Sequence, residues 1–110
     1  MQAYHHKLIS RLEAMNLTYD QIGELTLSSE RVVQSWLQKK TSPEKIYVQQ
    51  LERVARLVEA LRGLINPAYF NNWLMRPNKF FGKSPYQAII DGDYDKLNEF
   101  ILTTREGVFA

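Results

Sequence analysis

The stretch TYDQIGELTLSSERVVQSWL, residues 18–37, has the residue spacing of a helix-turn-helix unit. Thr18 is a suitable N-cap for a first helix that ends near Leu25. A second helix is predicted over residues 28–38, where Ser28 and Ser29 are suitable N-caps. Such a unit needs a very small residue on its first helix so that the second helix can cross closely, and Gly23 has that position. The stretch therefore predicts two helices in tight contact.

The apolar residues of this stretch agree with that packing, but one turn residue does not. Ile22 precedes the glycine, and Val33, Trp36 and Leu37 lie at helical spacing on the inward face of the second helix. Leu27 stands where the turn usually has glycine, and the left-handed conformation that glycine adopts there is unfavourable for leucine. We therefore expect a turn that is distorted or extended by one residue.

A second helix that enters a DNA major groove would read bases with its exposed early residues, which are Ser29, Glu30, Arg31, Gln34 and Ser35. Arg31 suits a guanine edge and Gln34 an adenine edge. Phosphates would pass near three lysines, Lys39, Lys40 and Lys45. The alternative is an ordinary three-helix packing unit with a solvated polar face, and Glu30 on the reading face opposes tight DNA binding.

Helical periodicity extends N-terminal and C-terminal of this stretch, and no segment alternates with a period of two. An N-terminal helix is predicted by Tyr4, Leu8, Leu12 and Met15. Ser42-Pro43 predicts the cap and first turn of a long helix. The apolar stripe of that helix consists of Tyr47, Leu51, Val54, Val58, Leu61 and Leu64 or Ile65.

Short helices separated by proline and glycine are expected in the last third of the chain. Asn66-Pro67 ends the long helix, and residues 69–74 fit a short fifth helix. Residues 77–82 form a loop, residues 84–92 a helix that begins at Ser-Pro and ends at Gly, and Asp93 caps the last helix. The inward residues of that last helix are Leu97, Phe100 and Ile101. The predicted fold class is all-α, with one domain over residues 1–62 and a second over 63–110, joined through the long helix.

Composition favours a folded, soluble protein of the cytoplasm. The 110 residues are 45% hydrophobic and 12% aromatic, which is enough for a packed core. No apolar run approaches the length that spans a bilayer, and the first residues lack the apolar segment of a signal peptide. The chain has no cysteine, and its net charge of +2 is too small to indicate a polyanionic partner by itself.

Tests for catalytic and metal chemistry give a negative result. Asp91–Asp95 is similar to the start of a calcium loop, but the sixth and twelfth positions, which need Gly and Glu, are Lys96 and Leu102. Helix caps explain Asp91 and Asp93 better. His5-His6 has no carboxylate nearby in sequence, and no catalytic triad, phosphate loop or zinc motif is present. We therefore predict a protein that is not an enzyme and has neither metal nor cofactor.

The C-terminal part has a specific pattern of residues: Trp73-Leu74, Arg76-Pro77-Asn78, Phe81-Gly82, Ser84-Pro85, Ala88, Gly92-Asp93 and Leu97. This pattern resembles the C-terminal domain of the MbcA/ParS/Xre-type antitoxins. The ending Glu106–Phe109 is similar to that of mycobacterial members, and the N-terminal half fits the same family. In the turn, Lys83 stands where the family usually has a second glycine.

The resemblance implies an antitoxin of a type II toxin–antitoxin module. Its partner would be a RES-domain toxin that degrades NAD, and its helix-turn-helix would bind operator DNA for autoregulation. The implied toxin-binding residues are Trp73, Arg76, Pro77, Asn78, Glu106, Gly107, Val108, Phe109 and Ala110. A homodimer, or a larger hetero-oligomer with the toxin, is expected, with no membrane partner.

The tail, residues 106–110, has the chemistry of a plug for a nucleotide pocket. Val108 and Phe109 are apolar where a free chain end is normally polar, and Phe109 offers the largest area for burial. Glu106 would meet cationic groups that bind phosphate. The alternative for the tail is that it folds back on its own core, and the alternative for the protein is a stand-alone helix-turn-helix transcription regulator.

Overall fold

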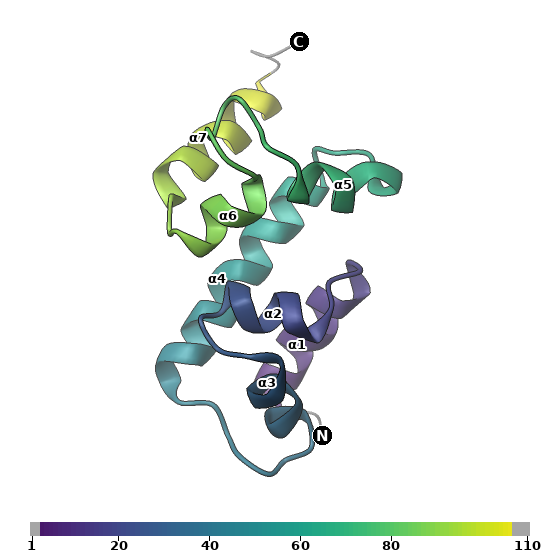
Figure 1. Cartoon of the computed structure of the whole chain (residues 1–110), viewed down its shortest axis with the longest axis vertical. Helices are drawn as coiled ribbons and strands as arrows, with labels where there is room; N and C mark the ends of the chain where they lie inside the picture. Colours follow the sequence, from purple (N-terminus) through teal and green to yellow (C-terminus); the bar gives the residue numbers. More distant parts are fainter. Residues whose placement is uncertain (1–2, 107–110) are drawn as a thin grey trace. The chain divides into compact units, whose positions relative to one another are not determined.

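The structure, a computed structural model, describes residues 3–106. Within that range the chain is helical, and its one strand-like feature is an isolated bridge between Asn78 and Lys83. The elements are α1 (Tyr4–Ala14), α2 (Tyr19–Leu25), α3 (Glu30–Leu37), α4 (Lys45–Arg62), the 3₁₀ turn η1 (Pro67–Tyr69), α5 (Phe70–Met75), α6 (Pro85–Ile90) and α7 (Tyr94–Arg105), as traced in Figure 1. The predicted all-α class is confirmed.

The chain divides into two compact units, Met1–Arg56 and Leu57–Ala110, and the division falls inside α4. The N-terminal unit contains α1, α2, α3 and the first part of α4, and the C-terminal unit contains the rest. None of the helices within residues 3–106 has the length and apolar character needed to cross a membrane.

Helix α1 contributes one face to the core of the N-terminal unit. Leu8, Leu12 and Met15 are buried, as their helical spacing predicts, and Ile9 is buried as well. Tyr4 differs from the prediction because it is 52% exposed. Partial burial of the hydroxyl, followed by a hydrogen bond with Glu52 of α4, raises the pKa of Tyr4.

Helix α2 begins at Thr18 with a complete capping box. The Thr18 hydroxyl accepts a hydrogen bond from the Gln21 N–H at 3.1 Å, and the Gln21 side chain accepts one from the Thr18 N–H at 3.0 Å. Two of the N–H groups that a helix start leaves without partners are thereby satisfied. The predicted cap is confirmed.

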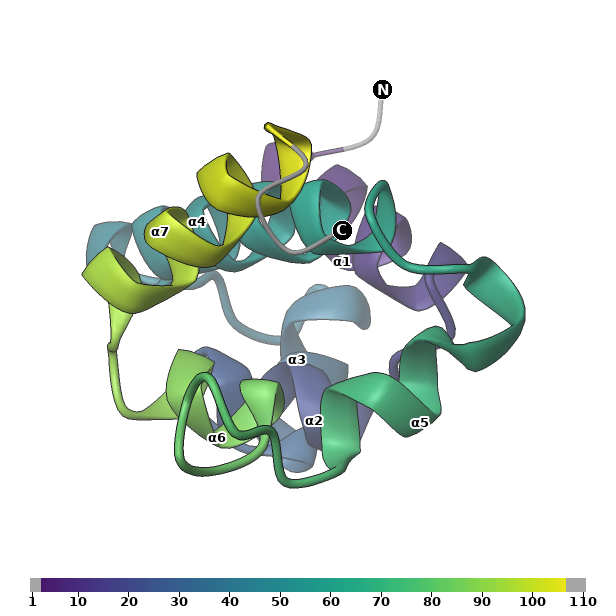
Figure 2. The same ribbon diagram turned by 90° about the horizontal axis from the view of Figure 1, so that it is seen from above.

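Gly23 allows α2 and α3 to approach each other, and Figure 2 shows the two helices in contact from a second direction. A Cβ atom at residue 23 would lie 2.5 Å from the Ser29 carbonyl carbon and 2.9 Å from the Glu30 nitrogen. Both neighbours are backbone atoms, so neither can rotate away. The requirement for a residue without a side chain, predicted from the spacing, is therefore confirmed.

The turn between α2 and α3 is tight, and Leu27 itself takes the left-handed conformation, with φ of 60°. The Leu27 N–H donates to the Glu24 carbonyl at 3.1 Å, and the Ser28 N–H donates to the Gly23 carbonyl at 2.8 Å. These two bonds define a Schellman motif, the common way to end a helix. The expected lengthening or distortion of the turn is wrong, because these bonds hold leucine in a conformation that glycine would adopt more easily.

The same motif ends four helices of the described chain. The left-handed residue is Asn16 after α1, Leu27 after α2, Lys39 after α3 and Gly92 after α6, with φ values of 68°, 60°, 61° and 74°. In each case the following residue donates to the carbonyl five positions back. Only Gly92 was predicted as such a helix end, because glycine is the residue that marks the motif in a sequence.

Replacing Leu27 with glycine should stabilise the protein by about 0.5–1 kcal/mol, because the left-handed conformation costs leucine more than glycine. Little burial would be lost, since Leu27 is 65% exposed. Leu27→Ala is the matched control, because alanine removes the same side chain but keeps the backbone cost. Chemical denaturation of the two variants measures the difference, and equal stabilities would contradict this explanation.

Helix α4 begins later than predicted. Ser42-Pro43 does not cap it, because the first helical residue is Lys45 and the Glu44 carbonyl accepts from both Tyr47 and Val48. The helix ends at Arg62, so Leu64 and Ile65 lie beyond it. Of the other predicted stripe residues, Leu51, Val54, Val58 and Leu61 are buried and Tyr47 is half-buried.

The C-terminal unit is assembled from short capped helices, in which α6 contacts both α5 and α7. Ser84 caps α6 by accepting a 3.0 Å hydrogen bond from the Gln87 N–H, and Pro85 occupies the first turn, as predicted. Asn66 caps η1 through a bond from Ala68. Tyr69 lies in this 3₁₀ turn and is 64% exposed, so it does not join the inward residues of α5.

Candidate functional site

Asn78 organises the loop between α5 and α6. Its N–H donates to the Lys83 carbonyl at 3.0 Å, and its own carbonyl accepts from the Gly82 N–H at 2.9 Å. Its side-chain oxygen accepts a 2.8 Å hydrogen bond from the Phe80 N–H. Gly82 has a φ of 72°, so the backbone favours glycine there although a Cβ would meet nothing within 4 Å. Asn78 therefore has a structural role within the loop.

Lys83 connects this loop to the junction of α6 and α7. Its Nζ lies 2.7 Å from Asp91 Oδ2 and 2.9 Å from Asp93 Oδ2, and we name these three residues the Lys83 clamp. The two aspartates occupy the predicted cap positions, Asp91 at the C-cap of α6 and Asp93 at the N-cap of α7, but their carboxylates bind Lys83. Asp93 has the N-cap position of α7 but its side chain makes no capping hydrogen bond, because the carboxylate pairs with the ammonium instead.

The clamp shifts the pKa values of Lys83 and Asp91. The hydrogen bond from Lys83, followed by one from Gln87, lowers the pKa of Asp91. The hydrogen bonds to Asp91 and Asp93 raise the pKa of Lys83. Both charged forms are therefore favoured in the folded protein at neutral pH.

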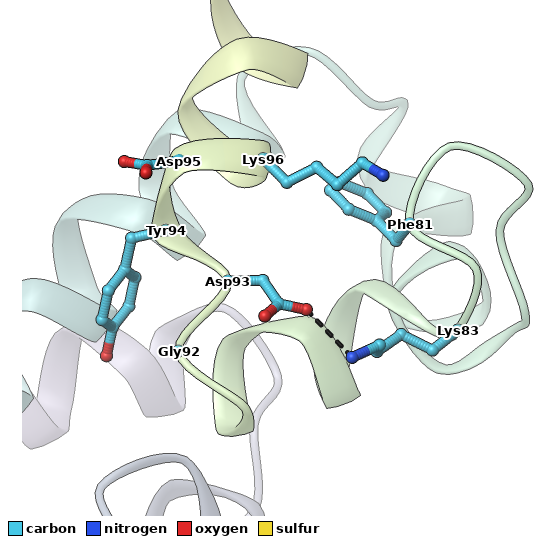
Figure 3. Close-up of a pocket in the computed structure, with 7 residues that line it drawn as sticks. All are labelled: Phe81, Lys83, Gly92, Asp93, Tyr94, Asp95 and Lys96. Atoms are coloured by element: carbon cyan, nitrogen blue, oxygen red, sulfur yellow. Dashed lines mark hydrogen bonds and ion pairs between the residues drawn. The ribbon is translucent and has the colours of Figure 1, made fainter.

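An open hollow of about 570 Å³ lies beside the clamp, lined by Phe81, Lys83, Gly92, Asp93, Tyr94, Asp95 and Lys96. Figure 3 shows the Asp93 carboxylate turned toward the Lys83 ammonium, while Asp95 and Tyr94 point away from it. Lys96 extends toward Phe81 in the same view, and its Nζ lies 5.8 Å from the centre of the Phe80 ring. Because acidic and basic groups line it together, the hollow has no clear preference for a charged ligand.

Replacing Lys83 with methionine should lower the unfolding midpoint modestly near neutral pH. The Asp91 contribution is present above the ordinary carboxyl pKa of 3.8 and is lost as pH falls through its lowered folded value. The Lys83 contribution is present below the ordinary lysine pKa of 10.5 and is lost as pH rises through its raised folded value. The difference in unfolding midpoint between wild type and Lys83→Met should thus be constant from about pH 5 to 9 and should shrink toward about pH 2. Thermal melts at each pH measure this difference in midpoint. A difference that persists in acid would contradict the stabilising role of the Lys83 clamp.

Five aromatic side chains gather between α5, the loop and α7. Phe100 is central, with ring centres 5.5 Å from Trp73, 5.5 Å from Phe80 and 5.4 Å from Phe81. Phe70 extends the group, at 6.2 Å from Trp73. Phe70 and Phe81 are buried, whereas the other three remain partly accessible. The cluster thus fixes α5 and α7 together and still leaves aromatic surface available for contact.

The predicted toxin-binding residues divide between surface and interior. Arg76 and Pro77 are exposed directly after α5, and Glu106 is exposed at the end of α7. Trp73 and Asn78 are half-buried and participate in the cluster and the loop described above. Gly107, Val108, Phe109 and Ala110 lie outside the described residues.

The predicted DNA-reading residues lie mainly on one exposed side of α3. Glu30, Arg31 and Gln34 are exposed, while Val33 and Trp36 of the same helix are buried. The remaining exposed positions of the predicted set are Ser29, Lys39 and Lys40. The amphipathic division expected from the spacing is therefore present.

Gln34 and Ser35 each make a side-chain hydrogen bond that restricts their availability for DNA. The Gln34 amide donates to the Glu30 carboxylate at 3.4 Å, so a base edge would have to compete with Glu30 for Gln34. The Ser35 hydroxyl is half-buried and lies 2.9 Å from the Thr41 hydroxyl. Ser35 therefore connects α3 to the segment that follows it.

Sequence reasoning missed the role of His6. The side chain is buried, and its Nε2–H donates to the Trp36 carbonyl at 2.8 Å, which ties α1 to the end of α3. Thirty positions separate the two residues, so no local pattern indicates the bond. Across residues 3–106, no group of three or more His, Cys, Asp or Glu side chains is arranged to hold a metal ion.

Comparison with known proteins finds relatives of this chain among the mycobacterial MbcA antitoxins. Mycobacterial cidal antitoxins MbcA from Mycobacterium tuberculosis and Mycobacterium bovis are each 28% identical over 100 residues, which cover 90% of this chain and 88% of the relative. A chain in the crystal structure of the M. tuberculosis MbcT–MbcA toxin–antitoxin complex has a TM-score of 0.81 and 25% identity, with both chains covered completely. No family model matches the chain.

The chain is a homologue of the MbcA antitoxins. The similarity extends through both units of this MbcA homologue and is not restricted to the short motif around Asn78. The resemblance recognised from the residues is therefore confirmed at the level of homology and of fold.

Proposed function

We propose that this protein is the antitoxin of a type II toxin–antitoxin module and neutralises its toxin by direct binding. The observation that supports this most strongly is the similarity of the whole chain to MbcA, which has been crystallised in complex with the toxin MbcT. The proposed partner is a RES-domain protein that degrades NAD. In this proposal the antitoxin blocks access to the NAD pocket and has no catalytic role of its own.

The C-terminal unit offers a coherent surface for that partner. The aromatic cluster holds α5 against α7, so Trp73 and the exposed Arg76-Pro77 stay near the helix that leads to Glu106. Met75 and Leu102 add exposed apolar area on α5 and α7. Partly accessible aromatic residues beside a cationic side chain are typical of the residues that dominate protein interfaces.

The test is co-expression with the product of the adjacent gene. The tagged chain should retain that product through purification, and cells that express both should keep their NAD, whereas cells with the partner alone should lose it. Failure to retain a RES-type partner, together with unchanged NAD in all cells, would refute the proposal.

The second proposed activity is binding to operator DNA through α3, which would make the antitoxin an autoregulator. Support comes from the exposed polar side of α3 and from the close α2–α3 crossing at Gly23. A stand-alone regulator would need the same surface but would act without a toxin.

Replacing Arg31 with alanine should weaken specific operator binding by about 1–3 kcal/mol and relax base preference at one position. Arg31 is exposed on α3, so the fold should be unaffected. Arg53, which is exposed on α4, provides a control arginine outside the proposed reading face. Gel-shift titration measures both variants, and equal affinities for Arg31→Ala and Arg53→Ala would contradict direct reading by α3.

A further inference from the structure

A second hollow, of about 390 Å³, lies in the N-terminal unit and includes Lys39, one of the lysines predicted to lie near DNA phosphates. Its walls come from three segments: the start of α1, the last turn of α3 and the connection to α4. The lining residues are Ala3, His5, His6, Trp36, Lys39, Thr41 and Ser42. None of them has a carboxylate, and together they offer an ammonium, two imidazoles and two hydroxyls.

The chemistry of these groups suits an oxyanion. Lys39 contributes a positive charge, and the hydroxyls of Thr41 and Ser42 are hydrogen-bond donors. Partial burial and the neighbouring imidazole of His6 lower the pKa of His5, while a hydrogen bond to the Trp36 backbone raises it. The His5 ring is therefore part of the wall, and the donors that face a ligand are Lys39, Thr41 and Ser42. Several neutral donors around one cation are typical of phosphate sites in proteins.

The hollow is built on a fixed backbone. His6 donates to the Trp36 carbonyl at 2.8 Å, and the Lys39 N–H donates to the same carbonyl at 3.2 Å. The Lys40 N–H donates to the Ser35 carbonyl at 3.0 Å, and the Ser35 and Thr41 hydroxyls are 2.9 Å apart. The walls are therefore held in place without a ligand, which lowers the cost of binding one.

Lys39 occupies the left-handed position of the helix end, where glycine is the favoured residue. Its side chain is exposed, so no burial compensates for the backbone cost. A strained residue that presents a charged group to a hollow is the kind of feature that marks a binding role.

We propose that this hollow binds a phosphate group, supplied by the backbone of DNA that contacts α3. The inference rests on the proposed DNA binding, and it adds the start of α1 and the hydroxyl groups of Thr41 and Ser42 to that interface. One phosphate would lie between the Lys39 ammonium and the hydroxyl groups of Thr41 and Ser42. A contact of this kind positions a protein on the duplex without reading its sequence.

Lys39→Gly isolates the ammonium, because glycine fits the left-handed backbone and should leave the helix end intact or more stable. Lys7→Ala is the matched control, since Lys7 is an exposed lysine of α1 that does not line the hollow. Affinity is measured for a duplex taken from the DNA upstream of the chain's own gene, over a range of salt concentrations. We expect about a tenfold loss for Lys39→Gly and a salt slope smaller by about one, with Lys39→Arg close to wild type.

Inorganic phosphate, titrated while the amide signals of residues 39–42 are followed by NMR, distinguishes the two sources of the ligand. Shifts there together with the selective loss of DNA binding would support the proposal. Equal losses for Lys39→Gly and Lys7→Ala would overturn it and leave DNA binding by α3 intact. Phosphate shifts in a chain that binds no duplex would refute DNA as the source, along with the proposed DNA binding. The absence of both responses would refute the site itself.

Discussion

Replacing Gly23 with alanine should destabilise the N-terminal unit by about 3 kcal/mol, near the upper end of what overpacking costs. The added methyl would lie 2.5 Å from the Ser29 carbonyl carbon, a separation that real Cβ atoms do not show. Relief requires α3 to move away from α2, which would disturb the Ser29 cap and the Leu27 turn together. The free energy of unfolding from chemical denaturation measures the effect.

Gly63→Ala is the matched control for that experiment. The nearest atoms to a Cβ at Gly63 are carbonyl oxygens at 3.5 and 3.6 Å, which is ordinary contact, and the backbone there needs no left-handed conformation. This variant should be neutral, or more stable by about 0.5 kcal/mol through the lower entropy of the unfolded chain. Similar losses at Gly23 and Gly63 would mean that the close crossing of α2 and α3 is not the reason for glycine.

Removing Gly107–Ala110 should abolish neutralisation of the toxin, which is the second large effect expected. These residues follow Glu106, the exposed C-cap of α7, and include the apolar pair Val108-Phe109. A single Phe109→Ala change should weaken toxin binding about 30-fold or more, since loss of a central aromatic anchor typically costs at least 2 kcal/mol.

The fold of the truncated protein provides the control for the tail. Helix α7 ends at Arg105, and its buried residues Leu97 and Ile101 remain in place after truncation. The unfolding midpoint should therefore stay close to that of the full chain. A large fall in the midpoint would favour the alternative in which Val108 and Phe109 fold back on their own core.

Local patterns predicted the helices and several of their ends well. Thr18, Ser84 and Gly92 mark helix boundaries through bonds that span only a few residues, so each is readable from the sequence. Gly23 was identified because a close helix crossing admits no side chain. In these cases a single local requirement selects the residue type.

Features that depend on tertiary contacts were missed or misread. Asp91 and Asp93 stand at the predicted cap positions, but no local pattern indicates that the loop brings the Lys83 ammonium within 2.9 Å of both carboxylates. His6 has no partner near it in sequence, because its acceptor is the Trp36 carbonyl. Leu27 was taken as an obstacle to a tight turn, although two backbone bonds are sufficient to hold leucine in the left-handed conformation. None of these arrangements follows from periodicity.

The candidate binding surfaces likewise include a part that local sequence patterns predict and a part that depends on tertiary contacts. The exposed side of α3 follows from helical spacing, whereas the hollow beside Lys39 depends on how α1 meets the end of α3. The aromatic cluster around Phe100 likewise combines α5, the loop and α7, which are separate in sequence. Residue types alone indicate which side chains bind, but the fold determines which of them act together.

The most direct test of the account measures NAD consumption by the purified product of the adjacent gene in the presence of increasing antitoxin. The full chain should stop consumption at a fixed molar ratio, while the chain that lacks Gly107–Ala110 should leave it unaffected even in excess. Continued NAD consumption with excess full chain would contradict the proposed neutralisation. Complete inhibition by the truncated chain would contradict the proposed role of the tail.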